Sequence, residues 1–224
     1  MADEGLPVIV YVDENEDARE DFYIDAKKTK LFRKIIILPP EPTLAEMVAN
    51  LAQINFEALI SDFRLADAAG TDYDGSALVA AFLQIRTGFP CFIRTSYDNE
   101  ALHAADDVNR VYSKEIEAAG VGVRPLFERI NLQIQRMRRQ MEAWSGELEE
   151  LLKLERTKLS APEIDRIIEL DGLIEANMGG EHEIAQTTKK LLLDGDFYER
   201  QNELLTATEE LIDRIKKNLN TGNG

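Results

Sequence analysis

Five short runs of apolar residues alternate with amphipathic stretches over the first 120 residues of the chain. Each run is only four or five residues long and lacks the regular polar alternation of a strand with one exposed face. Such runs are typical of strands that are buried on both faces of a parallel sheet. The expected strands are Val8–Val12, Lys34–Leu38, Ala58–Ser61, Cys91–Arg94 and Arg110–Ser113.

The stretches between these runs have helical patterns, and the second of them opens with the capping box Thr43-x-x-Glu46. Strands and helices in strict alternation form right-handed crossovers and a parallel sheet that is covered on both faces. Residues 1–120 are therefore expected to form an α/β domain with a five-stranded, doubly wound parallel sheet. The expected helices are Glu16–Lys30, Thr43–Gln53, Gly75–Arg86 and Asn99–Asp107.

The apolar pattern changes after residue 120 from short runs to one long stripe. Pro125 suits the first turn of a helix, and apolar residues then recur at spacings of three and four over more than three heptads. This seam must be buried, either against the same stretch of a second chain or against the helices that follow. Its members are Phe127, Ile130, Ile134, Met137, Met141, Trp144, Leu148 and Leu151.

Further helices follow the long one. Ser160 and Glu163 form a capping box with Pro162 in the first turn, and Gly179 and Gly180 end that helix. Two more helices are expected at about 181–193 and 197–219. We therefore predict that residues 121–224 form an all-α helical bundle or coiled-coil domain that begins with a long connecting helix.

The charge of the chain limits its partners. It carries 26 Lys and Arg residues against 42 Asp and Glu residues, a net charge of −16. The general attraction to phosphate that dominates nucleic-acid binding is absent overall, so DNA is not expected as a partner. The single Cys91 has no partner for an internal disulfide, and no apolar run reaches the roughly 18 to 20 residues that span a bilayer. We expect a cytoplasmic protein that does not enter the membrane.

Carboxylates follow two of the predicted strands at the point where each strand ends. Asp13 and Glu14 come directly after the first strand, and Asp62 follows the third. In open α/β sheets the ligand crevice lies beyond the carboxyl ends of the strands. Three carboxylates there repel one another unless a cation lies among them, and a site of oxygen ligands suits Mg²⁺.

Thr95 and Lys114 bring a hydroxyl and an ammonium to the ends of the fourth and fifth strands. With these two residues, the stretch from about 6 to 120 resembles the receiver domain of two-component response regulators, which has the flavodoxin-like strand order 2-1-3-4-5. The resemblance implies that Asp62 is the phosphoacceptor and that Asp13 and Glu14 hold Mg²⁺ with it.

The same resemblance implies further roles. The backbone carbonyl of Arg64 would be another metal ligand, Thr95 the switch hydroxyl and Lys114 the invariant lysine. A histidine kinase or phosphotransfer protein would donate the phosphoryl group, and a protein partner would receive the output, with a homodimer expected through the long helix. The chain would be a regulatory phosphoprotein rather than an enzyme, with at most weak catalysis of its own phosphorylation and dephosphorylation.

Some features depart from the family or leave alternatives open. Val111 stands where many receivers have a Tyr or Phe, and the stretch 66–74 is longer than usual, so it is either a lid over the site or a solvated loop. A receiver fold that acts only as a scaffold or adaptor is one alternative function. A phosphorelay through His182, which begins a His-Glu pair, is another.

Overall fold

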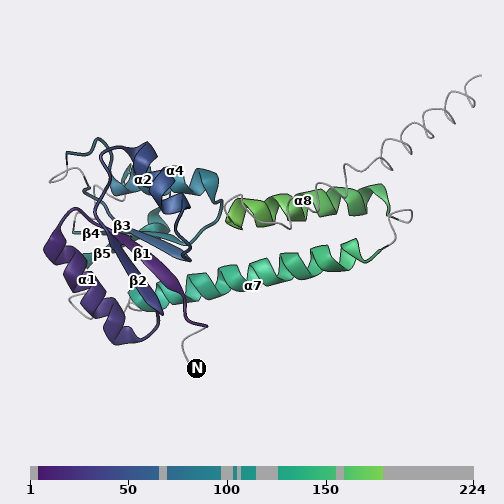
Figure 1. Cartoon of the computed structure of the whole chain (residues 1–224), viewed down its shortest axis with the longest axis horizontal. Coiled ribbons are helices and arrows are strands. Elements are labelled where there is room, and N and C mark those ends of the chain that lie inside the picture. Colours follow the sequence, from purple (N-terminus) through teal and green to yellow (C-terminus); the bar gives the residue numbers. More distant parts are fainter. Residues whose placement is uncertain are drawn as a thin grey trace, which may run out of the picture. The chain divides into compact units, whose positions relative to one another are not determined.

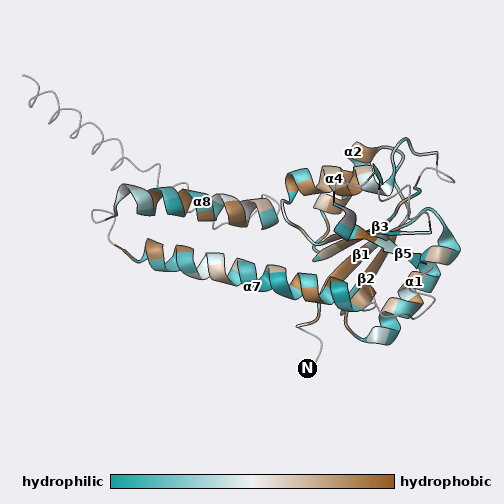
Figure 2. Cartoon of the chain, turned by 180° about the vertical axis from the view of Figure 1, so that it is seen from behind, coloured by the Kyte–Doolittle hydropathy of each residue, from teal (hydrophilic) through white to brown (hydrophobic). Residues whose placement is uncertain are grey.

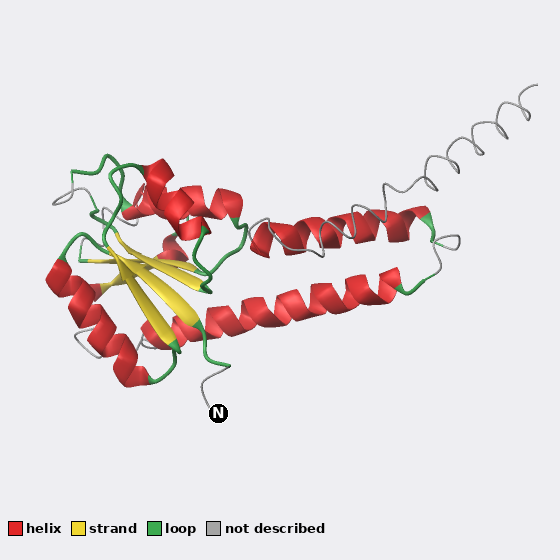
Figure 3. Ribbon diagram, viewed as in Figure 1, coloured by secondary structure: helices red, strands yellow, loops and turns green. Residues whose placement is uncertain are grey.

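The computed structural model describes residues 5–65, 70–96, 103–104, 107–114, 126–154 and 159–178, and the structural statements below concern these residues. One sheet of five parallel strands organises them (Figures 1 and 3). The strand order is β2-β1-β3-β4-β5, so the predicted doubly wound, flavodoxin-like receiver fold is confirmed. The strands are β1 (Val8–Val12), β2 (Lys34–Leu38), β3 (Ala58–Asp62), β4 (Cys91–Thr95) and β5 (Val111–Ser113).

The short apolar runs located the strands to within one residue at each end. β3 and β4 each extend one residue beyond the predicted ends, to Asp62 and Thr95. β5 begins at Val111 rather than at Arg110, because residues Val108–Arg110 form a 3₁₀ turn, η1. β5 is also an edge strand that pairs only with β4 among the described strands. A short edge strand leaves few unpaired backbone groups for another chain to pair with.

Two helices of the described residues cover each face of the sheet (Figure 1). α1 (Glu16–Thr29) and α7 (Leu126–Leu152) pack on one face, and α2 (Leu44–Ala52) and α4 (Gly75–Ile85) pack on the other. Because side chains alternate along a strand, β1 serves both cores. In Figure 2 the strands are hydrophobic along their length, as expected for strands buried on both faces, whereas α1 and α7 carry both hydrophobic and hydrophilic residues.

Local signals begin the helices where the sequence indicated. The Thr43 side chain accepts a hydrogen bond from the Glu46 N–H, and the Glu46 carboxylate accepts one from the Thr43 N–H, so the capping box of α2 is present. Asn15 caps α1 with its side-chain oxygen alone, which accepts a hydrogen bond from the Ala18 N–H. The predicted helix at 99–107 falls mostly outside the described residues.

Two different parts of the chain bury the heptad seam of α7. Its first part lies in the sheet core, where Ile130 and Ile134 are fully buried together with Leu126. Further along, α7 packs against α8 (Ala161–Met178). There Leu148 is buried, and the remaining seam members that the sequence proposed are half-buried: Met137, Met141, Trp144 and Leu151. The predicted homodimer through this helix stays a prediction.

An ion pair also joins α7 to α8. The Arg166 guanidinium of α8 donates to both carboxylate oxygens of Glu147, each at 2.7 Å. Bidentate pairs of this kind fix the orientation of the two side chains as well as their separation. The α7–α8 pair is therefore held in register by a charged contact in addition to its apolar seam.

Contacts within the chain divide it into two compact units, Met1–Glu181 and His182–Gly224. The expected boundary near residue 120 stays a prediction, because residues 115–125 are outside the described part. The helices expected at 181–193 and 197–219 lie outside it too. Among the described helices, none combines the length and apolar character that crossing a bilayer requires.

Candidate functional site

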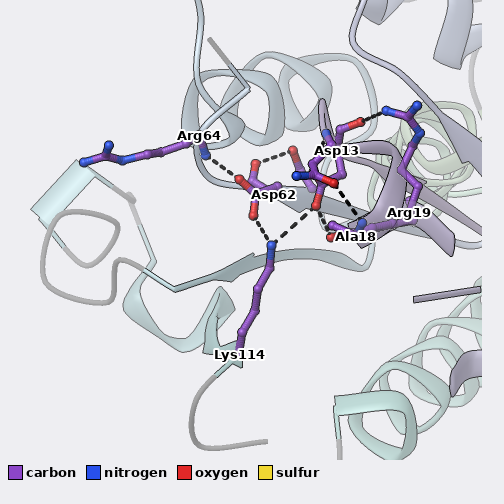
Figure 4. A network of polar contacts seen from close by, with 9 residues as sticks. Asp13, Ala18, Arg19, Asp62, Arg64 and Lys114 are labelled. Atoms are coloured by element: carbon purple, nitrogen blue, oxygen red, sulfur yellow. Dashed lines mark hydrogen bonds and ion pairs between the residues drawn. The ribbon is translucent and has the colours of Figure 1, made fainter. Parts of the chain in front are cut away.

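The predicted site residues gather at the carboxyl end of the sheet (Figure 4). Asp62 is the last residue of β3, and Asp13 directly follows β1, the neighbouring strand. Lys114 directly follows β5, two strands away from β3. Parallel strands bring these residues together because all of their carboxyl ends lie on one edge.

Lys114 bridges the two aspartates. Its Nζ donates to Asp62 Oδ1 at 2.6 Å and to Asp13 Oδ2 at 3.4 Å (Figure 4). Asp13 is 1% exposed and Asp62 is 6% exposed, whereas Lys114 is half-buried. Two carboxylates this far from water need a counter-charge, and the ammonium supplies it.

The backbone of Arg64 holds the other carboxylate oxygen of Asp62. Its Oδ2 accepts a hydrogen bond of 2.7 Å from the Arg64 N–H, while the Arg64 side chain points away from the carboxylate (Figure 4). Burial raises the pKa of the Asp62 carboxyl, and the hydrogen bonds from Lys114 and Arg64 oppose that rise. The result is a carboxylate with one donor on each oxygen at the carboxyl end of β3.

Four donors hold Asp13, three at its carboxylate and one at its backbone carbonyl. Its Oδ1 accepts from the Asn15 N–H at 2.9 Å, and its Oδ2 accepts from the Tyr11 hydroxyl at 2.5 Å as well as from Lys114. The Arg19 guanidinium donates to the Asp13 backbone carbonyl at 2.7 Å (Figure 4). The sequence analysis missed Tyr11 and Arg19, although a phenol in an otherwise aliphatic buried strand is itself a signal that a hydrogen-bond partner lies nearby.

Glu14 differs from the two aspartates because one of its oxygens is unused. Glu14 Oε2 is buried and has no hydrogen-bond partner. Burial raises the pKa of Glu14 to about 7, and the negative charges of Asp13 and Asp62 add to that rise. A buried carboxylate oxygen without a hydrogen-bond partner is a suitable ligand for a cation.

The donor set suits Mg²⁺, because Asp13, Glu14 and Asp62 offer only oxygen atoms. Among the described residues, however, no group of three or more Asp, Glu, His or Cys side chains is arranged so that it could hold a metal ion. Lys114 holds the two aspartates instead. Binding of Mg²⁺ would therefore require these side chains to rearrange, and the roles assigned to them stay predictions.

Thr95 ends β4 next to the site. It is fully buried and lies opposite Ser113 in the pairing of β4 with β5. The sheet thus places a hydroxyl on the strand between those of Asp62 and Lys114, as its position in the sequence predicted. Its function as a switch stays a prediction.

The stretch after Asp62 is partly packed. Residues 66–69 are outside the described part, but Thr71 and Tyr73 are buried. The Tyr73 hydroxyl donates to the Glu41 carbonyl at 2.9 Å, and the Thr71 hydroxyl donates to the Leu65 carbonyl at 3.0 Å. The described half of this stretch is therefore anchored in the α2–α4 core through Tyr73, and the two alternatives, lid or solvated loop, stay predictions.

Among comparisons with known proteins, only solved structures gave matches, and these are distant. No family model matches the sequence, and no curated protein matches it. A solved response regulator, RcsB in complex with DNA, is 13% identical, with 81% of this chain and 96% of that chain covered and a TM-score of 0.39. RcsB of Salmonella enterica serovar Typhimurium, bound to a promoter in the presence of the phosphomimetic BeF₃⁻, is 16% identical, with coverages of 80% and 95% and a TM-score of 0.39.

A second kind of protein is also among the similar structures. The anti-anti-sigma factor PhyR of Bartonella quintana is 13% identical, with 63% of this chain and 51% of that chain covered and a TM-score of 0.42. Both RcsB structures were solved with DNA, so the expectation that DNA is not a partner gains no support from these comparisons.

Proposed function

We propose that this protein is a receiver-type signalling protein in which Asp62 accepts a phosphoryl group from a histidine kinase or phosphotransfer protein. The observation that carries the proposal is the Lys114 bridge, which joins two buried carboxylates from separate strand ends. A constitutive scaffold would not need an ammonium held between two carboxylates, each of which costs free energy to bury.

In the proposed reaction, one oxygen of the Asp62 carboxylate attacks the phosphorus of the donor. A new bond forms between that oxygen and phosphorus, and the bond from phosphorus to the donor breaks, with its electron pair leaving on the donor. The product is an acyl phosphate. Mg²⁺, held by Asp13, Glu14, Asp62 and the Arg64 carbonyl, would neutralise the charge that spreads over the phosphoryl oxygens.

Lys114 and Thr95 would respond to the new charge. The acyl phosphate adds about −1.5 to −2 charges next to Lys114, whose shorter contact is already with Asp62. The ammonium would follow the phosphoryl oxygens and release Asp13, and the Thr95 hydroxyl would donate to another of these oxygens.

A change at Asp13 would reach α7 through Tyr11, which donates to Asp13 and belongs to the same core as the first turns of α7. Phe22 of α1 packs edge-on against Phe127 at the start of α7, with ring centroids 5.2 Å apart, and both belong to the core on that face of the sheet. The state of Asp62 would thereby bias how the helical half binds its partner. To move such an equilibrium from mostly off to mostly on, phosphorylation must favour one state by about 5.5 kcal/mol.

Phosphoryl uptake tests the proposal directly. After incubation with Mg²⁺ and a small acyl phosphate, the intact mass of the protein should increase by one phosphoryl group. Asp62→Asn should abolish this increase, because a neutral amide does not attack phosphorus. Asp72→Asn is the matched control, since Asp72 is an exposed carboxylate in the stretch after β3, and it should be phosphorylated like the unmodified chain.

The same samples test the link to the helices. Trp144, the only tryptophan, is half-buried on α7, so its fluorescence reports on the helical half. Beryllofluoride with Mg²⁺ should change that fluorescence in the unmodified chain and in Asp72→Asn but not in Asp62→Asn. If the unmodified chain gains no mass, or Asp62→Asn gains as much, the proposal is wrong and the scaffold alternative is favoured.

A further inference from the structure

Tyr11 is the fourth of the five residues of β1 and donates a hydrogen bond to the acidic site from within the core. It is fully buried, and its hydroxyl donates to Asp13 Oδ2 at 2.5 Å. Every other member of β1 is an aliphatic residue. A buried phenol must satisfy its hydroxyl, and here the partner is a carboxylate that we have placed in the phosphoryl-transfer site.

The position of the Tyr11 ring is closely determined by its surroundings. The ring stacks on Phe22 with centroids 3.9 Å apart and an interplanar angle of 14°. Phe22 is held in turn by the Arg94 guanidinium, 5.6 Å from its centroid, and by Phe127 at its edge. The backbone of Tyr11 is paired on both sides, with β2 and with β3. The hydroxyl therefore has little freedom to leave Asp13.

The other donors to Asp13 differ in how firmly they are held. The Asn15 N–H donates to Oδ1 and belongs to the backbone. Lys114 reaches Oδ2 at only 3.4 Å, against 2.6 Å for its contact with Asp62, and it sits at the end of a flexible, half-exposed side chain. If Lys114 moves with the charge on Asp62, the Tyr11 hydroxyl is the donor that stays on Oδ2.

We propose that Tyr11 is a positioning residue that holds the Asp13 carboxylate in the orientation in which it binds the divalent cation. This inference rests on the proposed function, because it assigns the cation to the phosphoryl-transfer site. A carboxylate that is already oriented binds the ion without reorganising, so affinity depends on the residue behind it as well as on the ligand itself. Loss of such a partner typically weakens metal binding by about 10- to 100-fold.

Tyr11→Phe removes only the hydroxyl and keeps the ring that stacks on Phe22. Titration calorimetry of the full chain with Mg²⁺ alone should give a dissociation constant about tenfold higher for this variant. Tyr23→Phe is the matched control, because Tyr23 is 37% exposed on α1, and its dissociation constant should not change. Should Tyr11→Phe fail to fold, Phe22→Leu keeps the hydroxyl but frees the ring, and it should weaken Mg²⁺ binding severalfold.

A second readout separates positioning from a general structural role. In Tyr11→Phe, the Mg²⁺ concentration for half-maximal phosphoryl uptake should rise, while the rate at saturating Mg²⁺ should stay as in the unmodified chain. An unchanged dissociation constant in the folded variant would overturn the role of Tyr11 and leave the proposed function standing. A lower saturating rate with unchanged Mg²⁺ dependence would overturn it as well. If the unmodified chain shows no Mg²⁺ binding and no uptake, the proposed function fails and the role of Tyr11 falls with it.

Discussion

Because Gly75 has no side chain, α4 can begin directly against the end of β3 that carries Asp62. A Cβ on Gly75 would lie 2.0 Å from the Asp62 carbonyl oxygen, which is a backbone atom with little room to move. The Gly75 N–H also donates to the Phe63 carbonyl at 2.8 Å. The close approach of α4 to the β3 end, and with it the position of Asp62, therefore depends on glycine at this position.

Gly75→Ala should lower the free energy of unfolding by about 2 to 3 kcal/mol, because the added methyl must push α4 or the β3 end out of place. Gly146→Ala is the matched control in the interior of α7, where a Cβ meets nothing within 4 Å. It should raise stability by about 0.5 to 1 kcal/mol through better helix propensity. Urea unfolding of both variants checks the pair, and equal effects of the same sign would contradict the proposed contact.

At the scale of the elements, α7 is anchored to the end of the sheet opposite the candidate site. The Arg138 guanidinium makes a bidentate ion pair with Glu57, at 2.5 and 2.8 Å, and also donates to the Gly5 carbonyl at 2.7 Å. Glu57 directly precedes β3, so the long helix is fixed to the beginning of the strand that carries Asp62 at its other end. The two residues of this ion pair are far apart in the sequence, so no local pattern indicated the contact.

Arg138→Met keeps most of the apolar stem of the side chain but loses the ion pair, and we expect it to cost about 1 kcal/mol, because the pair is partly exposed to solvent. A double-mutant cycle with Glu57→Gln should give a coupling energy of similar size. Arg139→Met, at the exposed neighbouring position, should change stability by less than about 0.5 kcal/mol. A coupling energy near zero would mean that another contact anchors α7.

For the whole molecule, the first half of α7 belongs to the core of the α/β domain. Leu126, Ile130 and Ile134 are each almost fully buried in the same cluster as Tyr11 and Phe22. A chain cut at residue 120 would expose the apolar side chains of that face of the sheet, and small domains have little stability to spare. The functional division of the chain therefore need not coincide with the change in sequence pattern near residue 120.

A fragment of residues 1–120 should lack a cooperative thermal transition, whereas a fragment of residues 1–181 should unfold cooperatively near the midpoint of the full chain. The physical reason is that only the longer fragment retains the α7 residues that complete the core. Circular dichroism during heating measures both transitions. A cooperative, stable 1–120 fragment would show instead that the sheet domain does not depend on α7.

Several features of the fold and the site were predictable because they depend on local signals. Short apolar runs located the strands to within a residue or so, and the capping box at Thr43 marked the start of α2. Asp13, Asp62 and Lys114 were expected together because each lies at the carboxyl end of a strand in a parallel sheet. The start of β5 was one residue wrong, because an apolar pattern does not distinguish a 3₁₀ turn from the first residue of a strand.

The sequence by itself determined the order of the elements, the apolar face of each one and the strand ends that carry charge, because these follow from spacing along the chain. Only the tertiary structure decided what covers each face and which charges meet. Spacing marked Ile130 and Ile134 as members of a seam, but packing placed them on the sheet. Likewise the hydrogen bond from Tyr11 to Asp13 and the Lys114 bridge depend on side-chain positions that only the packed core sets.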